Sequence, residues 1–288
     1  VNLTGLNNLV LIGDHVEILF NPAMVNFDGI ENVGILNGDL TIFGNDQLSS
    51  LAGLNTILVI QGNVVISENS NLQSLAGLEN LQSLGGALRF YNNSMLENLE
   101  GLNSLRSIGG FFDIWQNNAM TTLSGVESLN SVADFVRIFN NASLNSLEGL
   151  NNLEEINGDL SISLNSSLQT ITQLSNLSSI NGDLNFLSNS SLESLNGIDG
   201  LNPGSINDLR IFGCSNLSSC DVESICSYLG VPSNTAIITS NEVGCSNRDE
   251  ILFHCENTVG TASRKLSSNA LTGIPNPTNA KIYLNEIS

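Results

Sequence analysis

Apolar residues recur along this chain in a pattern that repeats every 24 residues, and residues 38–61 show one complete unit. Its apolar positions are Leu40, Ile42, Leu48, Leu51, Leu54, Ile57 and Ile60. The first two alternate with Thr41 and Phe43, which is the period of two expected of a strand with one buried face. The later positions lie three residues apart, whereas an α-helix mixes intervals of three and four to keep one face apolar. The unit therefore predicts short strands joined by turns, with few helices.

Two further columns keep the same period. Asparagine recurs at Asn21, Asn45, Asn69, Asn93, Asn117, Asn141, Asn165 and Asn189. Glycine recurs in parallel from Gly5 to Gly197, and Gln173 interrupts that series once. Such repetition indicates a solenoid, because one unit cannot bury its leucines until a second unit stacks on it. An amide just inside a turn can bond backbone groups of its own coil and of the next, so we interpret the asparagine column as a structural ladder.

Stacked units place each apolar column on its own copy about 4.8 Å away, which is the spacing of paired strands. We therefore predict an all-β protein, a β-solenoid of 24-residue coils, over residues 1–213. After Asn189 the period lengthens, and the next ladder positions are Cys214 and Asn241, which follow at intervals of 25 and 27 residues. Residues 214–257 are accordingly expected to form a small C-terminal cap, and residues 258–288, rich in Ser, Asn and Thr, a linker.

The cap is expected to contain two short helices with a strand between them. The segment DVESICSYL offers Asp221 as a helix N-cap, and SNRDEILFHC offers Ser246 or Asn247. The strand is expected in AIITSN. All five cysteines of the chain also lie in the cap, and their spacings lack the paired C-x-x-C of zinc sites. This distribution favours disulfides, and hence a protein exported to an oxidising compartment.

The net charge of the chain argues against two classes of binding partner. The chain has 28 acidic and 8 basic residues and a net charge of -20, so nucleic acids and anionic membranes would be repelled. No apolar stretch of about 18 residues or more occurs, so we expect no transmembrane segment. Aromatic residues make up only 5% of the chain against 41% hydrophobic residues, which predicts an aliphatic core.

The residues that enzymes use are sparse. His15 and His254 are the only histidines and lie far apart in the repeat, so a histidine-based triad or a multi-histidine zinc site is not expected. Asp159 and Asp183 occupy the same place in adjacent coils and could bind calcium, although we favour a role in the turns before the strands. We therefore expect neither an enzyme nor a cofactor.

The outward positions of the predicted strands concentrate unusual residues. Three of the eight basic residues share one column, and the only tryptophan stands in the next column between a tyrosine and a phenylalanine. Because Trp, Tyr and Arg are enriched in binding sites, we predict a ligand-binding surface. Its residues are Arg89, Tyr91, Asp113, Trp115, Arg137 and Phe139. The alternative is a self-satisfied surface, in which Asp113 pairs with both arginines and the aromatic rings stack on one another.

The unit GDLTIFGNDQLSSLAGLNTI and its copies resemble the receptor L-domain, the leucine-rich right-handed β-helix of insulin- and epidermal-growth-factor-receptor ectodomains. They are most similar to the L-domain-like surface proteins of Bacteroidetes. The resemblance covers about residues 3–257 and implies this fold and a recognition role, with no catalytic residue. Near the end of the chain, IPNPTNAKIYLN is similar to the opening of the type IX secretion sorting domain, which implies export across a bacterial outer membrane.

The resemblance also bears on the cysteines. Leucine-rich repeats accept cysteine at the ladder position, so we expect Cys214 to be a buried free thiol. The segment that it opens resembles the cysteine-containing cap of such arrays. The other four cysteines allow three pairings, of which our working hypothesis joins Cys220 to Cys245 and Cys226 to Cys255.

These features predict a secreted or bacterial cell-surface recognition or adhesion module that binds a protein or glycan through its exposed strand face. A structural spacer or surface-layer component without a specific ligand is the first alternative. A polysaccharide-active enzyme of the solenoid type is the second, with Arg89, Asp113 and Arg137 as its candidate residues.

Overall fold

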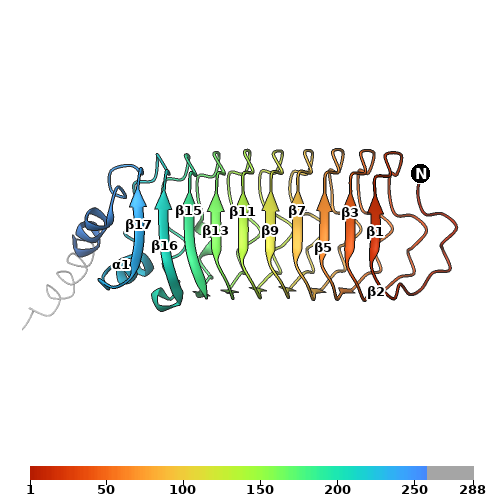
Figure 1. Ribbon diagram of the computed structural model, residues 1–288, viewed down its shortest axis with the longest axis horizontal. Coiled ribbons are helices and arrows are strands. Elements are labelled where there is room, and N and C mark those ends of the chain that lie inside the picture. The colour runs from red at the N-terminus through yellow and green to blue at the C-terminus, as the bar shows by residue number, and fades with distance from the viewer. Residues whose placement is uncertain (258–288) are drawn as a thin grey trace, which may run out of the picture.

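The computed structural model describes residues 1–257 and shows a rod of stacked coils, as the repeat predicts (Figure 1). Within these residues, ten parallel strands form one long sheet in chain order. They are β1 (Val16–Leu19), β3 (Leu40–Phe43), β5 (Val64–Ser67), β7 (Leu88–Tyr91), β9 (Phe112–Trp115), β11 (Val136–Phe139), β13 (Leu160–Ser163), β15 (Gly182–Leu187), β16 (Ile206–Phe212) and β17 (Thr235–Thr239). Each strand follows its neighbour after one whole coil, which confirms the predicted all-β solenoid.

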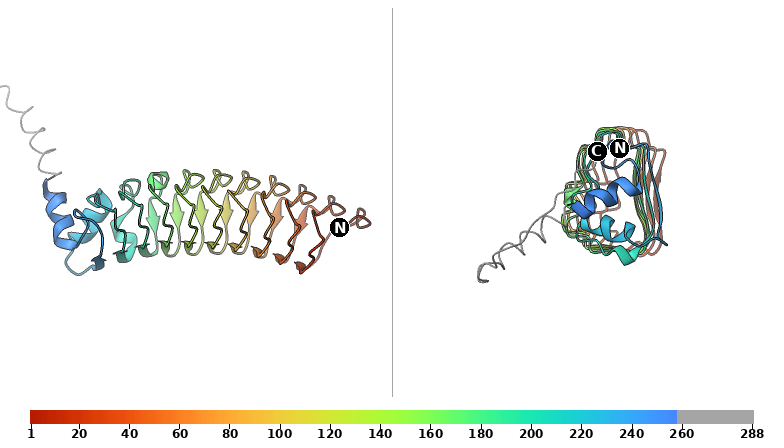
Figure 2. Two further views of the ribbon diagram at one scale, coloured as in Figure 1. Left: turned by 90° about the horizontal axis from the view of Figure 1, so that it is seen from above. Right: turned by 90° about the vertical axis from the view of Figure 1, so that its left-hand side faces the viewer.

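A second parallel sheet of two-residue strands runs along another side of the rod. Among the described residues it has seven strands. They are β2 (Ile35–Leu36), β4 (Val59–Ile60), β6 (Ser83–Leu84), β8 (Ser107–Ile108), β10 (Ser131–Val132), β12 (Glu155–Ile156) and β14 (Ser179–Ile180). Viewed from the end, the coils lie on top of one another, with the C-terminal helices across that end (Figure 2).

The 24-residue period sets the register between the coils. Leu40 pairs with Val64, and Ile42 pairs with Ile66, so each side chain stacks on its equivalent in the next coil. In β3 the two apolar residues are fully buried, while Thr41 and Phe43 on the outward face are partly exposed. The buried leucine columns merge into one continuous aliphatic core that runs the length of the rod.

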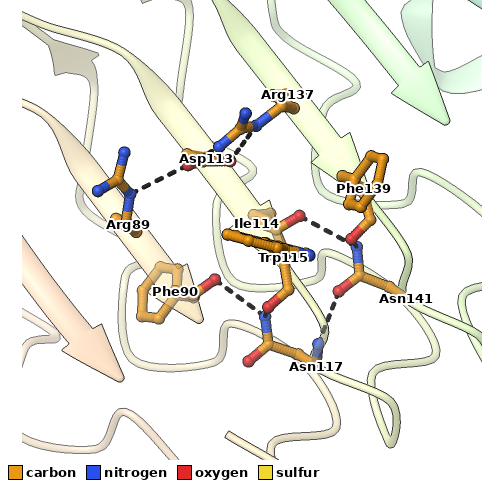
Figure 3. A network of polar contacts seen from close by, with 9 residues as sticks. All are labelled: Arg89, Phe90, Asp113, Ile114, Trp115, Asn117, Arg137, Phe139 and Asn141. Carbon is orange, nitrogen blue, oxygen red and sulfur yellow. Dashed lines mark hydrogen bonds and ion pairs between the residues drawn. The ribbon is translucent and has the colours of Figure 1, made fainter. Parts of the chain in front are cut away.

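The asparagine column forms the predicted ladder (Figure 3). The side-chain amide of Asn117 donates to the carbonyl of Phe90 at 3.1 Å, and its Oδ1 accepts the backbone N–H of Asn93 at 2.9 Å. Asn21, in the first strand-bearing coil, is exposed. The other members have no exposed surface: Asn45, Asn69, Asn93, Asn117, Asn141, Asn165 and Asn189.

From Gly5 to Gly197, glycine corners with positive φ recur in every coil except one. At Gln173 the glycine is missing, and a 3-10 helix, η1 (Thr172–Leu174), replaces the corner. A second 3-10 helix, η2 (Pro203–Ser205), precedes β16, where the coils begin to lengthen.

The cap follows β16 and contains the predicted strand, β17, and two helices. The first is α1 (Glu223–Leu229), and residues 248–257 are also helical. The expectation that Asp221 caps α1 is wrong: Val222 takes the N-cap position with an extended backbone, no side chain caps the helix, and Asp221 pairs with Ser219. At the second helix Asn247 is the cap, because its Oδ1 accepts the backbone N–H of Glu250 at 3.0 Å.

The disulfide pairing agrees with the working hypothesis. Cys220 is bonded to Cys245, and Cys226, in α1, is bonded to Cys255 in the second helix. Cys214 is free and buried, and burial raises the pKa of its thiol. It keeps the ladder position, since its sulfur lies 3.6 Å from the carbonyl oxygen of Phe186.

Within residues 1–257 no helix is both long and apolar enough to cross a membrane. The predicted linker and the segment IPNPTNAKIYLN, both in residues 258–288, lie outside the described residues.

Candidate ligand-binding face

Strands β7, β9 and β11 bring all six predicted site residues together on the outward side of the long sheet. The register pairs Arg89 with Asp113 and Asp113 with Arg137. It likewise pairs Trp115 with Tyr91 on one side and with Phe139 on the other. We call these six residues the aromatic–arginine patch.

The charged residues of the patch form one closed network (Figure 3). Arg89 Nε lies 3.0 Å from Asp113 Oδ2, and Arg137 binds the same carboxylate through Nε at 2.8 Å and Nη2 at 2.7 Å. Asp113 is fully buried, whereas both arginine side chains are 39% exposed. The hydrogen bond to Asp113 raises the pKa of the Arg137 guanidinium. Asp113 therefore holds the arginines in place and cannot itself reach a ligand.

The aromatic residues of the patch pack against one another. The Trp115 ring centroid lies 4.8 Å from that of Tyr91 in a tilted arrangement and 5.9 Å from that of Phe139 in an edge-to-face one. The Arg137 guanidinium lies 5.7 Å from the Trp115 ring centroid. The indole nitrogen of Trp115 is buried and has no hydrogen-bond partner. The patch is thus preordered by its own contacts, and it offers a ligand ring surface and the edges of two guanidinium groups.

Two phenylalanines that the sequence reasoning missed extend this packing. Phe111 and Phe135 lie just before β9 and β11, and their rings stack at 4.8 Å. The Arg89 guanidinium lies 4.9 Å from the Phe111 ring centroid, and that of Arg137 lies 5.9 Å from the Phe135 centroid. Their separation of 24 residues is the signal by which they could have been found.

A groove lies beside the patch, over β13, and the sequence reasoning missed it as well. The outward residues of β13 are Ser161 and Ser163, which are smaller than Arg137 and Phe139 on the preceding strand. The groove consists of two adjacent hollows of about 420 and 300 Å³, which share Arg137 and Ser161 in their lining. We call it the β13 groove.

Asp159 and Asp183, which were considered as calcium ligands, make contacts within the protein. Asp159 Oδ1 accepts the backbone N–H of Asp183 at 2.7 Å, as expected for a residue that fixes the turn before a strand. Asp183 in turn forms an ion pair with Arg210. In residues 1–257 no three His, Cys, Asp or Glu side chains come together in a way that could hold a metal ion.

Comparison of the chain with protein-family models, with curated proteins and with solved structures found no match.

Proposed function

We propose that the protein is a secreted or cell-surface recognition module that binds a protein or glycan through the outward face of β7 to β13. The observation that carries the proposal is the preordered aromatic–arginine patch beside a groove. This face gathers the only tryptophan and two of the eight basic residues of a chain that has a net charge of -20. Surface side chains that are already fixed lose little entropy on binding, which favours affinity.

Export is supported by the two disulfides of the cap, because such bonds persist in oxidising compartments. The resemblance of the repeat to L-domain surface proteins supports the same location and a recognition role. We include in the proposal that IPNPTNAKIYLN belongs to a type IX sorting signal.

A spacer without a ligand is the competing function, and the closed network around Asp113 would serve it equally well. The two differ in what Trp115 does. In a spacer the ring only joins neighbouring coils, whereas in a recognition module its exposed part also touches the ligand.

The test is Trp115→Ser, which gives β9 the outward serine that β13 carries at Ser163. Ligands are first identified by screening the whole chain on glycan and protein arrays. We expect the substitution to weaken binding at least about tenfold, as is typical for a central aromatic anchor. The matched control is Phe43→Ser, in the same column on β3 and away from the patch, which should leave affinity unchanged. If no ligand is found on the arrays and Trp115→Ser only lowers the melting temperature, the spacer stands instead. A ligand that Trp115→Ser binds as tightly as the wild type would show that the aromatic–arginine patch is not the binding site.

A further inference from the structure

The β13 groove has two chemically distinct ends. At one end the lining is apolar, with Phe139, Leu187 and Phe212, the last of which is 44% exposed. At the other end the lining is mixed, with Asp159 and Asn185 beside Phe135 and Val136. Ser161 lines both hollows and Ser163 lines the apolar one, and their hydroxyl oxygens lie 3.3 Å apart. A groove with one apolar end and hydroxyl, amide and carboxylate groups elsewhere suits a ligand that carries both apolar faces and many hydroxyl groups.

Resting on the proposed function, we propose that this groove is the seat of the ligand and that its occupant is a neutral oligosaccharide. A sugar ring presents an apolar C–H face, which packs on rings such as Phe139 and Phe212. Its neighbouring hydroxyl groups both donate and accept hydrogen bonds, which matches the serine hydroxyls, the Asn185 amide and the Asp159 carboxylate.

The backbone around the groove argues against an extended peptide as the occupant. Peptides that bind sheets gain most of their affinity by adding a strand to a free edge. Strand β13 is paired on both sides, with β11 and with β15, so it offers no such edge. A peptide lying in the groove would have to satisfy its own backbone groups with side chains alone.

The charges around the groove favour a neutral sugar over an acidic one. Arg137 is already bound to Asp113, and Arg210 is bound to both Asp183 and Asp208. With Asp159 at the mixed end, these two guanidinium groups stand among four carboxylates. On a chain with a net charge of -20, this arrangement repels uronic acids and sulfated sugars.

The groove can be filled without disturbing the core. Ser163→Phe places at the apolar end the side chain that the preceding coil carries as Phe139, so the sheet accommodates the ring at this position. The matched control is Ser67→Phe, the same change in the same column on β5, four coils away. Phe212→Ala is a second variant, which removes the wall of the groove and adds no bulk.

The whole chain and its variants are titrated calorimetrically with short neutral gluco-, manno-, galacto- and xylo-oligosaccharides, with uronic-acid oligosaccharides and peptides as comparison probes. We expect at least one neutral series to bind, and Ser163→Phe to weaken it at least about tenfold while Ser67→Phe leaves it unchanged. Phe212→Ala should weaken the same ligand, and it decides the matter if Ser163→Phe fails to fold.

The inference is overturned if no neutral oligosaccharide binds, if only acidic sugars or peptides bind, or if a bound neutral sugar is insensitive to both groove variants. Its failure is distinguishable from that of the proposed function. A protein ligand that is lost with Trp115→Ser but kept with Ser163→Phe would leave the recognition role standing and remove the sugar site.

Discussion

The ladder asparagines resolve a conflict that arises where each strand ends. The residue before the ladder position has a positive φ in every coil, as at Gln116 with 56° and at Leu164 with 59°. This left-handed conformation disfavours a side chain, and it turns backbone carbonyls inward, where no water reaches them. The buried amide supplies the missing donor, and its oxygen accepts the N–H of the coil before it. The column is therefore a condition for the turn itself.

Replacing Asn117 by alanine should lower the free energy of unfolding by at least about 1–3 kcal/mol, because buried backbone groups lose their partners. The groups affected are the carbonyls of Phe90 and Trp115 and the N–H of Asn93. The matched control is Asn21→Ala, in the exposed first member of the column, whose amide donates only to Leu19. Urea unfolding that gives the same midpoint for both variants would contradict the ladder interpretation.

At the scale of the element, the glycine corners set how closely the coils approach. At Gly101, which has φ of +118°, an added Cβ would lie 2.4 Å from the carbonyl carbon and oxygen of Leu75 in the preceding coil. At Gly5 φ is almost the same, +116°, but nothing lies within 4 Å of the added atom. The two positions therefore separate backbone strain from the contact between coils.

Gly5→Ala should cost about 1–3 kcal/mol, because backbone strain acts there alone. Gly101→Ala should cost at least twice as much, since the backbone of two coils must also move apart. Denaturant unfolding measures both variants. Equal losses of stability would show that strain alone, and not the contact with Leu75, keeps glycine in the column.

The second cap helix is an element whose stability depends on pH. The Glu250 carboxylate accepts hydrogen bonds from the hydroxyl and the backbone N–H of Ser246, and these lower the pKa of Glu250. A lowered pKa in the folded state means that the stabilisation is present above the ordinary glutamate value of about 4.3 and is lost as the pH falls through the lowered value. We expect the protection factor of the amides at the start of the 248–257 helix, which is the exchange rate corrected for its intrinsic dependence on pH, to fall on acidification over this range. Glu250→Gln should remove that pH dependence, and its persistence in the variant would assign it to another group.

Features that repeat with the 24-residue period could be predicted from the sequence. Features that depend on different side chains in neighbouring coils could not. The register of Leu40 on Val64 and the position of the ladder follow from the 24-residue interval alone. The β13 groove depends on serines standing between large residues of the strands on either side, which a search for unusual residue types passes over. The burial of Asp113 depends on how two arginine side chains fold over it. The conformations of these arginine side chains decide whether Asp113 is buried, and the sequence pattern does not specify those conformations.

At the scale of the whole molecule, the repeat has to distribute its negative charge. A solenoid stacks equivalent side chains about 4.8 Å apart, so identical charges in one column would repel one another along the rod. The column that accepts the N–H of the glycine corners avoids this by alternating amides with carboxylates. Its first seven members are Asn7, Glu31, Asn55, Glu79, Asn103, Glu127 and Asn151.

In this column Asn and Glu side chains both accept a hydrogen bond from the N–H of a corner glycine. Asn103 accepts the N–H of Gly101 at 3.1 Å, and Glu127 accepts that of Gly125 at 2.9 Å. An amide can also donate to the carboxylate beside it, as Asn55 does to Glu79 at 3.2 Å. At this pair the alternation replaces repulsion between adjacent coils by a hydrogen bond.

Asn103→Glu should test this directly, because it creates three successive carboxylates at positions 79, 103 and 127. The new side chain can still accept the N–H of Gly101, but it loses the hydrogen bond that the Asn103 amide donates to the Glu100 carboxylate at 3.1 Å. Two exposed like-charge contacts at the coil spacing should lower the free energy of unfolding by about 1–2 kcal/mol at low salt. The loss of stability should shrink in about 1 M salt, where the screening length falls to about 3 Å.

The control is Asn103→Gln, which has the length of glutamate without its charge and should match the wild type at both salt concentrations. If the Glu and Gln variants unfold at the same urea concentration in low salt, charge is not the reason for the alternation, and the column would be explained by its hydrogen bonds to the glycine corners alone.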